Sequence, residues 1–434
     1  MNGLKARMAN CRYGLERGVF QRLHSVEVKN MSERVCGVDV HRDSLVATIT
    51  GDSFKETGRF TNDVDGINSL KEWLNRQGCR RVAMESSGIY WVSLYLALED
   101  AGFDVLLANA RQVKGIPGRK TDQSDAEWLA NLLRSGLIKP SYVPEKRVRE
   151  LRELTRLRVK LVGTRTAFKN RCHKVLNRVN IRLGSKLSDV FGKAGKEILE
   201  GLMDGKTVDD ILEHTENKWL RKRGDEVRTV VKGVLSQSDI FILKQCVDMV
   251  EQLDEKILRV DAQIETLVNE RDVDIVSSVP GVGRKSAAAI TAEIGDAKRF
   301  ADGKKIASAA GLAPFVYQSA GKSFTGGITK QGSKWLRRSM VEAARVAVRA
   351  RDSKLRAFYL QIKARKGDKT AVVAVARKML TIIHHLLVNG ERYVEDGFEK
   401  RLRGRRAVHA GHVPLEEMVA VLRSAGYVVS GPFG

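Results

Sequence analysis

Four carboxylates near the start of the chain have the types and spacing of a metal-dependent catalytic site. Asp39 lies in a β-rich run, Glu85 ends a later one, and Asp122 and Asp125 stand three residues apart where a helix should begin. Residues three apart share one face of a helix, so this pair can reach one ion. For an isolated DxxD pair, an N-cap acid followed by a first-turn acid would be the simpler interpretation. The two further carboxylates favour a catalytic site for Mg²⁺ or Mn²⁺.

This acidic cluster belongs to a strongly basic chain of 434 residues. Lys and Arg number 76 against 52 Asp and Glu, a formal net charge of +24, and 43% of the residues are hydrophobic. Such an excess attracts phosphate backbones, and Mg²⁺ held by carboxylates can contact the phosphate that is cleaved. Nucleic acid is therefore the first expected partner, and an acidic membrane surface the second.

Strands and helices alternate around the four acids. Two β-rich runs flank a polar turn within residues 35–49, and further strands are expected over 80–88 and 103–110. Helices are expected over 66–78, over 91–102 and from the Asp122/Asp125 pair onward. This alternation predicts an α/β domain over residues 34–140, with its carboxylates arranged as in a ribonuclease-H-like nuclease. His41 follows Asp39 closely and is a further candidate contact at the site.

The middle of the chain, residues 141–271, is predicted to be a basic helical, coiled-coil segment. Residues 146–182 hold thirteen Lys or Arg against two Glu. Two apolar stripes have helical spacing: one comprises Leu154, Leu157, Leu161, Phe168, Cys172, Val175 and Val179, the other Leu243, Cys246, Val250, Leu253, Ile257, Val260, Ile264 and Leu267. The stripes could pack against each other within one chain, but we favour a pairing that includes another subunit.

A third, mainly helical domain is predicted over residues 272–395. Gly281 and Gly283 form a short turn before a helix that begins with Arg284 and Lys285. Backbone N–H groups at such a helix start can bind a phosphate. The turn is similar to that of a helix-hairpin-helix, a sequence-independent grip on DNA.

Hydroxyl and cationic side chains gather in residues 311–338, where Gly-rich loops are expected before a helix that begins at Ser333. A serine among fixed cations can attack a phosphodiester, because the cations stabilise charge that develops on the phosphate oxygens. A solvated Gly/Ser loop is the simpler alternative. The candidates for nucleophile are Ser319 and Ser323, and those for nucleic-acid contacts are Lys322, Lys330 and Arg337.

The remaining features indicate a soluble, cytoplasmic protein without disulfides or zinc. Residues 1–33 and 396–434 are predicted to be basic tails, and Met31 is an alternative start. The five cysteines lack ligand spacing, and no apolar run of about 18 residues is evident. His384 and His385 lie in an apolar helix and are expected to be structural.

Six motifs taken together resemble the DEDD transposases of the insertion-sequence-110 family. In chain order they are GVDVHRDS, AMESSGIYW, KTDQSDAEWLA, VPGVGRKSAAAI, AGLAP and ITKQGSKWLRR, within residues 34–395. The resemblance implies a RuvC-like domain whose metal ligands are Asp39, Glu85, Asp122 and Asp125. It also implies a coiled-coil segment and a transposase domain with a nucleophilic serine.

The resemblance assigns the nucleophile to Ser319, which would form a phosphoserine bond to DNA. This chain departs from the family's acid-Ser-Gly motif, because Gln318 precedes the serine and Gly321 comes one residue late. Ser323 is therefore the fallback. Members of the family that act as RNA-guided recombinases imply three partners: double-stranded donor and target DNA, a structured guide RNA, and further subunits in a dimer or tetramer.

Two other functions are compatible with the sequence. In a RuvC-like junction nuclease, water would be the nucleophile and the third domain would only hold DNA. In a non-catalytic nucleic-acid-binding scaffold, the four carboxylates would be dispensable.

Overall fold

The computed structural model describes residues 34–86, 88–109, 122–319, 322–350 and 353–395. The chain divides into two compact units, Met1–Val143 and Pro144–Gly434. The expected tails, residues 1–33 and 396–434, lie outside the described residues, as does the basic loop 110–121 that precedes Asp122.

The first unit is a five-stranded mixed sheet with helices on both faces. Its strands are β1 (Val35–Val40), β2 (Ser44–Thr50), β3 (Lys55–Thr61), β4 (Arg81–Glu85) and β5 (Asp104–Ala108), in the spatial order β3-β2-β1-β4-β5. β1 pairs antiparallel with β2 and parallel with β4, and β4 pairs parallel with β5. This order, with β2 alone reversed, is that of a ribonuclease-H-like sheet. The predicted hairpin at 35–49 is confirmed, whereas the edge strand β3 was not expected.

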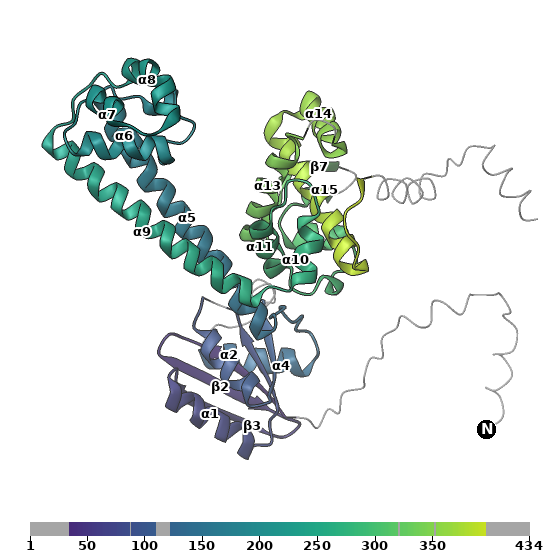
Figure 1. Ribbon diagram of the computed structural model, residues 1–434. Helices are drawn as coiled ribbons and strands as arrows, with labels where there is room; N and C mark the ends of the chain where they lie inside the picture. The colour runs from purple at the N-terminus through teal and green to yellow at the C-terminus, as the bar shows by residue number, and fades with distance from the viewer. Residues whose placement is uncertain (1–33, 87, 110–121, 320–321, 351–352, 396–434) are drawn as a thin grey trace, which may run out of the picture. The chain divides into compact units, whose positions relative to one another are not determined.

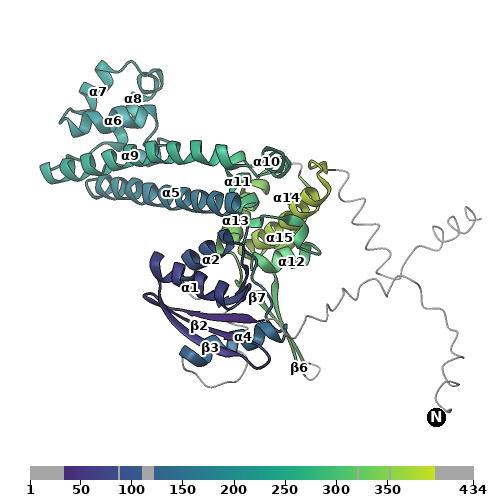
Figure 2. The ribbon, with the colours of Figure 1, turned by 90° about the horizontal axis from the view of Figure 1, so that it is seen from below.

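Alternation along β1 separates the two faces of this sheet. Cys36 and Val38 belong to a core with α1 (Val64–Arg76) and α2 (Trp91–Asp100). Val35 packs on the opposite face with Ala83 and Leu133, the last from α4 (Asp122–Arg134). Figure 2 shows α1 and α2 on one side of the sheet and α4 on the other.

Two long antiparallel helices, α5 (Lys146–Arg178) and α9 (Gln237–Leu267), form an arm in the second unit (Figure 1). Three ion pairs join the two helices: Arg158 with Asp261, Arg165 with Asp254 and Arg178 with Asp239. The residue numbers rise along α5 while they fall along α9, so the helices are antiparallel. The predicted α9 stripe is buried at Leu243, Cys246, Val250, Leu253, Ile257 and Ile264. These side chains are buried within one chain, where α9 packs against α5. Packing within one chain was the alternative to the favoured pairing with another subunit. The α5 prediction is wrong at Leu157, which is exposed.

A small helical lobe closes the far end of the arm. It contains α6 (Lys193–Met203), α7 (Val208–His214), α8 (Lys218–Val230) and the short 3₁₀ turn η2 (Leu183–Ser185). Its core includes residues of both arm helices, among them Cys172 and Cys246. A bridge between Ile181 and Val231 brings the entry and exit of the lobe together.

The C-terminal part of the second unit is a helical core with one β-ribbon. Its elements are α10 (Glu270–Ser277), α11 (Arg284–Ile294), η3 (Ala297–Arg299), α12 (Gly303–Ala309), β6 (Pro314–Ser319), β7 (Lys322–Ile328), α13 (Lys334–Ala347), α14 (Lys354–Lys366) and α15 (Asp368–Asn389). The predicted Gly-rich loops are thus partly wrong, because β6 and β7 pair as an antiparallel ribbon. His384 is buried and its Nε2 lies 3.1 Å from the carbonyl oxygen of Phe300, in the structural role expected.

Helix α15 is long and apolar, but Arg377 and Lys378 interrupt it, so it contains no run of about 18 apolar residues. Among the described residues, α15 alone has the length and composition of a membrane span, and 56% of its apolar stretch is buried within the protein. Core helices of soluble proteins satisfy the same criteria, and Ala371, Val375 and Met379 of α15 belong to the helical core.

Candidate active site

Asp39 and Glu85 occupy neighbouring positions at one edge of the sheet. β1 and β4 are parallel, with Gly37 opposite Ala83 and Val38 opposite Met84, so the next positions along are Asp39 and Glu85. Residues two apart share a face, which places both acids on the face that α4 covers. Adjacent strands lie about 4.8 Å apart, so the two backbones bring these carboxylates within reach of one ion.

The direction of α4 brings the other two acids to the same edge. Leu133, near the end of α4, packs against Val35 at the start of β1. A Cβ atom on Gly37 would lie 2.1 Å from the carbonyl oxygen of Ala126 and 2.4 Å from the nitrogen of Ala130, so α4 crosses β1 closely at this glycine. The helix therefore runs antiparallel to β1, and its beginning lies near the carboxyl end of that strand.

Asp122 and Asp125 are the first and fourth residues of α4. Asp125 is exposed, and the side chain of Asp122 lies outside the described part of the chain. The backbone thus gathers the positions of all four predicted acids at one edge. Among the described side chains, however, no three His, Cys, Asp or Glu residues form a metal-binding group. The backbone position of Asp122 is therefore consistent with its predicted role as a ligand, but the four carboxylates do not form a described metal-binding group.

Two residues outside the carboxylate set organise this edge. His41 places Nε2 3.0 Å from Oδ2 of Asp39, whose side chain is 18% exposed. Asn62, which directly follows β3, donates from Nδ2 to the carbonyl oxygens of His41 at 2.8 Å and Tyr90 at 3.3 Å. Asn62 therefore joins the turn after Asp39 to the segment after Glu85. Sequence reasoning missed it, because β3 lacks a strong apolar pattern.

The predicted nucleophile lies at the end of the β6–β7 ribbon. Ser319 is the last residue of β6 and pairs with Lys322, the first of β7, while Gln318 pairs with Ser323. Paired residues share a face and successive residues alternate, so Ser319 and Ser323 occupy opposite faces. Residues 320–321 and the side chains of both serines lie outside the described set. Ser319 is therefore the serine that shares a face with Lys322.

Of the other predicted contacts in this region, Arg337 is tied to the base of the ribbon. Its Nη1 donates to the carbonyl oxygens of Ala310 at 3.1 Å and Lys330 at 3.2 Å. Lys330 is exposed and has a left-handed backbone, with φ of 55°. Arg337 consequently holds the chain that enters α13, while Lys330 faces solvent.

The turn between α10 and α11 has a packing role at Gly281. This residue has φ of 83°, and a Cβ there would lie 2.5 Å from the carbonyl oxygen of Ala343 and from the nitrogen of Ala347 in α13. At Gly283, the N-cap of α11, a Cβ would have no neighbour within 4 Å among the described atoms. The predicted phosphate-binding turn is therefore open to solvent at Gly283 and closed at Gly281.

The cations that begin α11 are engaged within the chain. Arg284 contacts Glu265 at 2.5 Å and Glu270 at 2.7 Å, and Lys285 pairs with Asp261. The carboxylates of Glu270 and Glu265 raise the pKa of Arg284 above its usual range. Both side chains remain about half exposed, so any contact they make with a phosphate competes with these acids.

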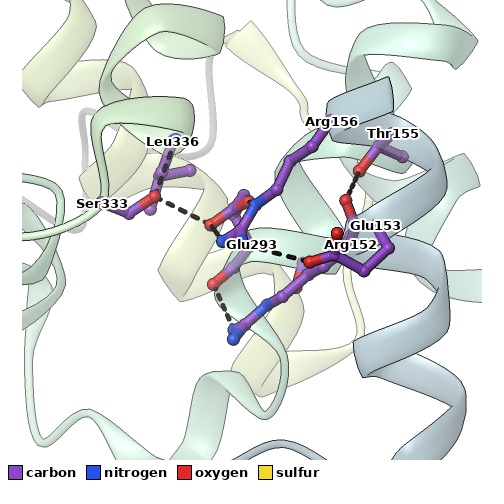
Figure 3. Close-up of polar contacts among 8 residues, drawn as sticks. Arg152, Glu153, Thr155, Arg156, Glu293, Ser333 and Leu336 are labelled. Carbon is purple, nitrogen blue, oxygen red and sulfur yellow. Dashed lines mark hydrogen bonds and ion pairs between the residues drawn. The ribbon is translucent and has the colours of Figure 1, made fainter. Parts of the chain in front are cut away.

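A buried acid fixes the base of the arm against α11 and α13. Glu293 receives Arg156 Nε at 2.7 Å and Ser333 Oγ at 2.8 Å, with its side chain 4% exposed (Figure 3). Arg152 donates to the carbonyl oxygens of Ala292 and Glu293 at 2.6 and 2.8 Å. Ser333 also caps α13, so one acid links three helices. The sequence carries no signal for this network because its partners are far apart along the chain.

Two family models match the chain. One, described as a transposase, matches residues 36–181, and the other, described as transposase IS116/IS110/IS902 family, matches residues 273–360. Together they cover more than half of the chain and contain every predicted catalytic residue.

Three relatives illustrate the similarity. The chain is 29% identical to a probable family 20 transposase of Pseudomonas aeruginosa, covering 70% of this chain and 83% of that protein. It is 25% identical to the transposase for insertion sequence element IS1111A of Coxiella burnetii, covering 87% and 98%. It is also 28% identical to a pilin gene-inverting protein of Moraxella bovis, covering 39% and 55%.

Proposed function

Because the chain belongs to the insertion-sequence-110 (IS110) family of transposases, we propose that it is a site-specific recombinase that cuts and rejoins DNA through a covalent serine intermediate. The observation that carries the proposal is the gathering of Asp39, Glu85 and the start of α4 at one sheet edge. The similarity to a gene-inverting protein supports recombination as the outcome.

In the proposed reaction the hydroxyl of Ser319 attacks a DNA phosphodiester. The Oγ–P bond forms, one P–O bond of the strand breaks, and the departing sugar oxygen takes a proton to become a hydroxyl. The serine proton passes to a base, and a strand hydroxyl later reverses these steps to release Ser319 and rejoin DNA. Lys322, paired with Ser319 across the ribbon, is suited to stabilise charge on the phosphate oxygens.

Asp39, Glu85, Asp122 and Asp125 would hold Mg²⁺ or Mn²⁺. Their fit rests on donor chemistry and placement, since carboxylate oxygens are the preferred ligands and all four positions lie at one edge. When bound, such an ion polarises a phosphoryl oxygen as a Lewis acid. Asn62 acts before any ion binds, because it fixes the segments that follow Asp39 and Glu85.

We further propose that a structured RNA guides the enzyme and that it works in the cytoplasm as a homo-oligomer, which would hold donor and target DNA together. The charge of +24 supports nucleic-acid partners. On α5, Lys160, Arg171 and Lys174 are exposed and make no ion pair with a described acid, so this helix retains cations for a phosphate backbone.

A covalent adduct tests the proposal. The full chain is incubated with Mg²⁺, labelled donor and target DNA and the RNA encoded beside its gene, then separated under denaturing conditions. A protein–DNA adduct should form with the wild type and with Ser323→Ala, and should disappear with Ser319→Ala.

The four carboxylates favour a second candidate, because they belong to one compact unit that lacks Ser319. A metal-dependent junction nuclease would use water as the nucleophile. It predicts that Ser319→Ala still cuts DNA and that Asp39→Asn does not, whereas a non-catalytic scaffold predicts that neither substitution has an effect.

A further inference from the structure

A large groove lies between α14, α15 and the base of the β-ribbon. It has a volume of about 1410 Å³, above the roughly 300–1,000 Å³ of typical small-molecule pockets. The lining positions recur every three or four residues along α14, from Lys354 to Lys366, and along α15, from Lys369 to Thr381. Each helix therefore presents one continuous face, and the groove suits an extended ligand.

The rim of this groove is cationic. Its lining includes Lys354, Arg365, Lys366, Lys369, Arg377 and Lys378 and, among described residues, no Asp or Glu. The nearby acid Asp368 accepts a hydrogen bond from the hydroxyl of Tyr359. A ligand that places negative charge along both helices matches this rim.

The groove differs from the basic residues at the contact between α5 and α9 and at the start of α11. Arg158, Arg284 and Lys285 are bound by acids of the same chain. In contrast, Arg365, Lys366, Lys369 and Arg377 make no ion pair with any described acid, and the first three of these are exposed. These cations are therefore available to a ligand without first breaking an internal salt bridge.

Between the cations the floor is apolar. Phe358, Ile362 and Val373 line it and are only partly buried by the helical core. Lys378 Nζ lies 4.7 Å from the centroid of the Phe358 ring, so charge and an aromatic face occur together. Bases and sugars can lie on such a floor while phosphates meet the rim, as in grooves that bind unpaired strands.

We propose that this groove binds single-stranded DNA. A duplex hides its bases, so it would leave the apolar floor uncovered. An RNA strand would bring 2′-hydroxyls to a floor whose neutral polar side chains are few, and burying unpaired hydroxyls costs free energy. From Lys369 to Arg377 the helix rises about 12 Å, so its cations can meet more than one phosphate of a bound strand.

The groove gives the proposed recombinase a place for a cleaved strand, and in this respect it depends on the proposed function. Pro314 of β6 and Ile328 of β7 belong to its wall, and Ser319 ends the same ribbon. Ser319 lies five residue steps beyond Pro314 along β6, or roughly 17 Å. A DNA strand bound in the groove would therefore lie within a few nucleotides of Ser319, the predicted nucleophile.

Binding of a fluorescent oligodeoxythymidine tests the groove independently of catalysis. The full chain carries Ser319→Ala without Mg²⁺, so no strand is cut. Adding Lys366→Gln and Lys369→Gln should lower the slope of log affinity against log salt by about 1.4, since each single-strand contact contributes about 0.7. From 1 M to 0.1 M salt, a slope lower by 1.4 means that the affinity of the variant rises about 25-fold less than that of the parent. With equal affinities at 1 M salt, the variant therefore binds about 25-fold more weakly at 0.1 M.

The matched control carries Lys304→Gln and Lys305→Gln on α12, which are exposed and outside the groove. It should bind like the parent. Equal losses in both variants, unchanged oligodeoxythymidine binding in the groove variant, or a loss of oligouridine or duplex binding in the groove variant as large as its loss of oligodeoxythymidine binding would overturn the proposal. Photocrosslinks from 5-iododeoxyuridine should fall within residues 354–381, and crosslinks found only elsewhere would also refute it. Because Ser319 is absent throughout, a failure here leaves the serine mechanism untouched, and the converse also holds.

Discussion

Replacing Gly37 with alanine should disable the carboxylate edge without unfolding the protein. Gly37 lies on β1, two residues before Asp39, where α4 crosses the strand. Its missing side chain allows the helix backbone to approach, with Ala126 and Ala130 as the nearest neighbours. The substitution therefore moves the helix that carries Asp122 and Asp125 relative to the strand that carries Asp39.

The structure sets the size of this displacement. An added Cβ would lie 2.1 Å from a backbone oxygen, whereas ordinary contact begins at 3.4 Å, so α4 has to retreat by about 1.3 Å. Overpacking of this kind typically costs about 1–3 kcal/mol of unfolding free energy. A misplacement of about 1 Å can reduce a catalytic rate about 100-fold. We therefore expect a folded protein with roughly one hundredth of the strand-cleavage rate.

The assay measures cleavage or adduct formation after thermal unfolding has shown that the variant is folded. Gly51→Ala is the matched control in the same unit, because its added Cβ would meet its neighbours at 3.4 and 3.5 Å. The control should retain activity. A fully active Gly37→Ala protein would contradict the inference that α4 positions two of the acids.

Three further predictions concern the second unit. Glu293→Gln should lower the unfolding free energy by about 1–3 kcal/mol in denaturant titrations, because Arg156 loses its charged partner on α11 and keeps only Glu153 among the described acids, whereas the exposed Glu255→Gln should cost under about 1 kcal/mol. Gly281→Ala should destabilise the protein in thermal melts and Gly283→Ala should not, since only the former meets the α13 backbone and has positive φ. The pKa of Asp261 is lowered because hydrogen bonds from Arg158 and Lys285 outweigh the opposing effect of burial. Its contribution to stability is therefore full above its ordinary pKa of about 4 and is lost as pH falls through the lowered value, so Asp261→Asn should flatten the acid limb of a stability–pH curve.

Local sequence patterns predict which strands and which helix carry Asp39, Glu85 and the DxxD pair, and their role as metal ligands stays a prediction. Asp39 lies within an apolar run, Glu85 ends one, and the DxxD pair begins an amphipathic helix. The pairing of β1 beside β4 is a long-range event, yet once both strands are parallel their carboxyl ends must share an edge. Asn62 escapes prediction because its role depends on two segments that meet only in the folded sheet.

Prediction from sequence is weaker where the composition of a segment is typical of another structure, or where the partners of a charged residue lie far away along the chain. β7 is rich in Gly, Ser and Thr, which is typical of loops, but its backbone pairing with β6 overrides this preference. Arg284 and Lys285 look like free cations in sequence, and their partners lie 14 to 24 residues away. Glu293 lies 137 residues from Arg156, beyond any local pattern.

The antiparallel arm has a consequence for how the chain folds. Arg178 and Asp239 are 61 residues apart, Arg165 and Asp254 are 89 apart, and Arg158 and Asp261 are 103 apart. The segment between Arg178 and Asp239 is the shortest of the three, so we expect this pair to form first. Each later pair extends a contact already made, so most of the entropy lost in loop closure is lost when the lobe forms. Pulse-labelling hydrogen exchange should protect α6 before the last turns of α9, and the reverse order would contradict this. The two arm helices are therefore expected to pair first beside the lobe. The contacts of Glu293 with Arg156 and Ser333 are expected to form last.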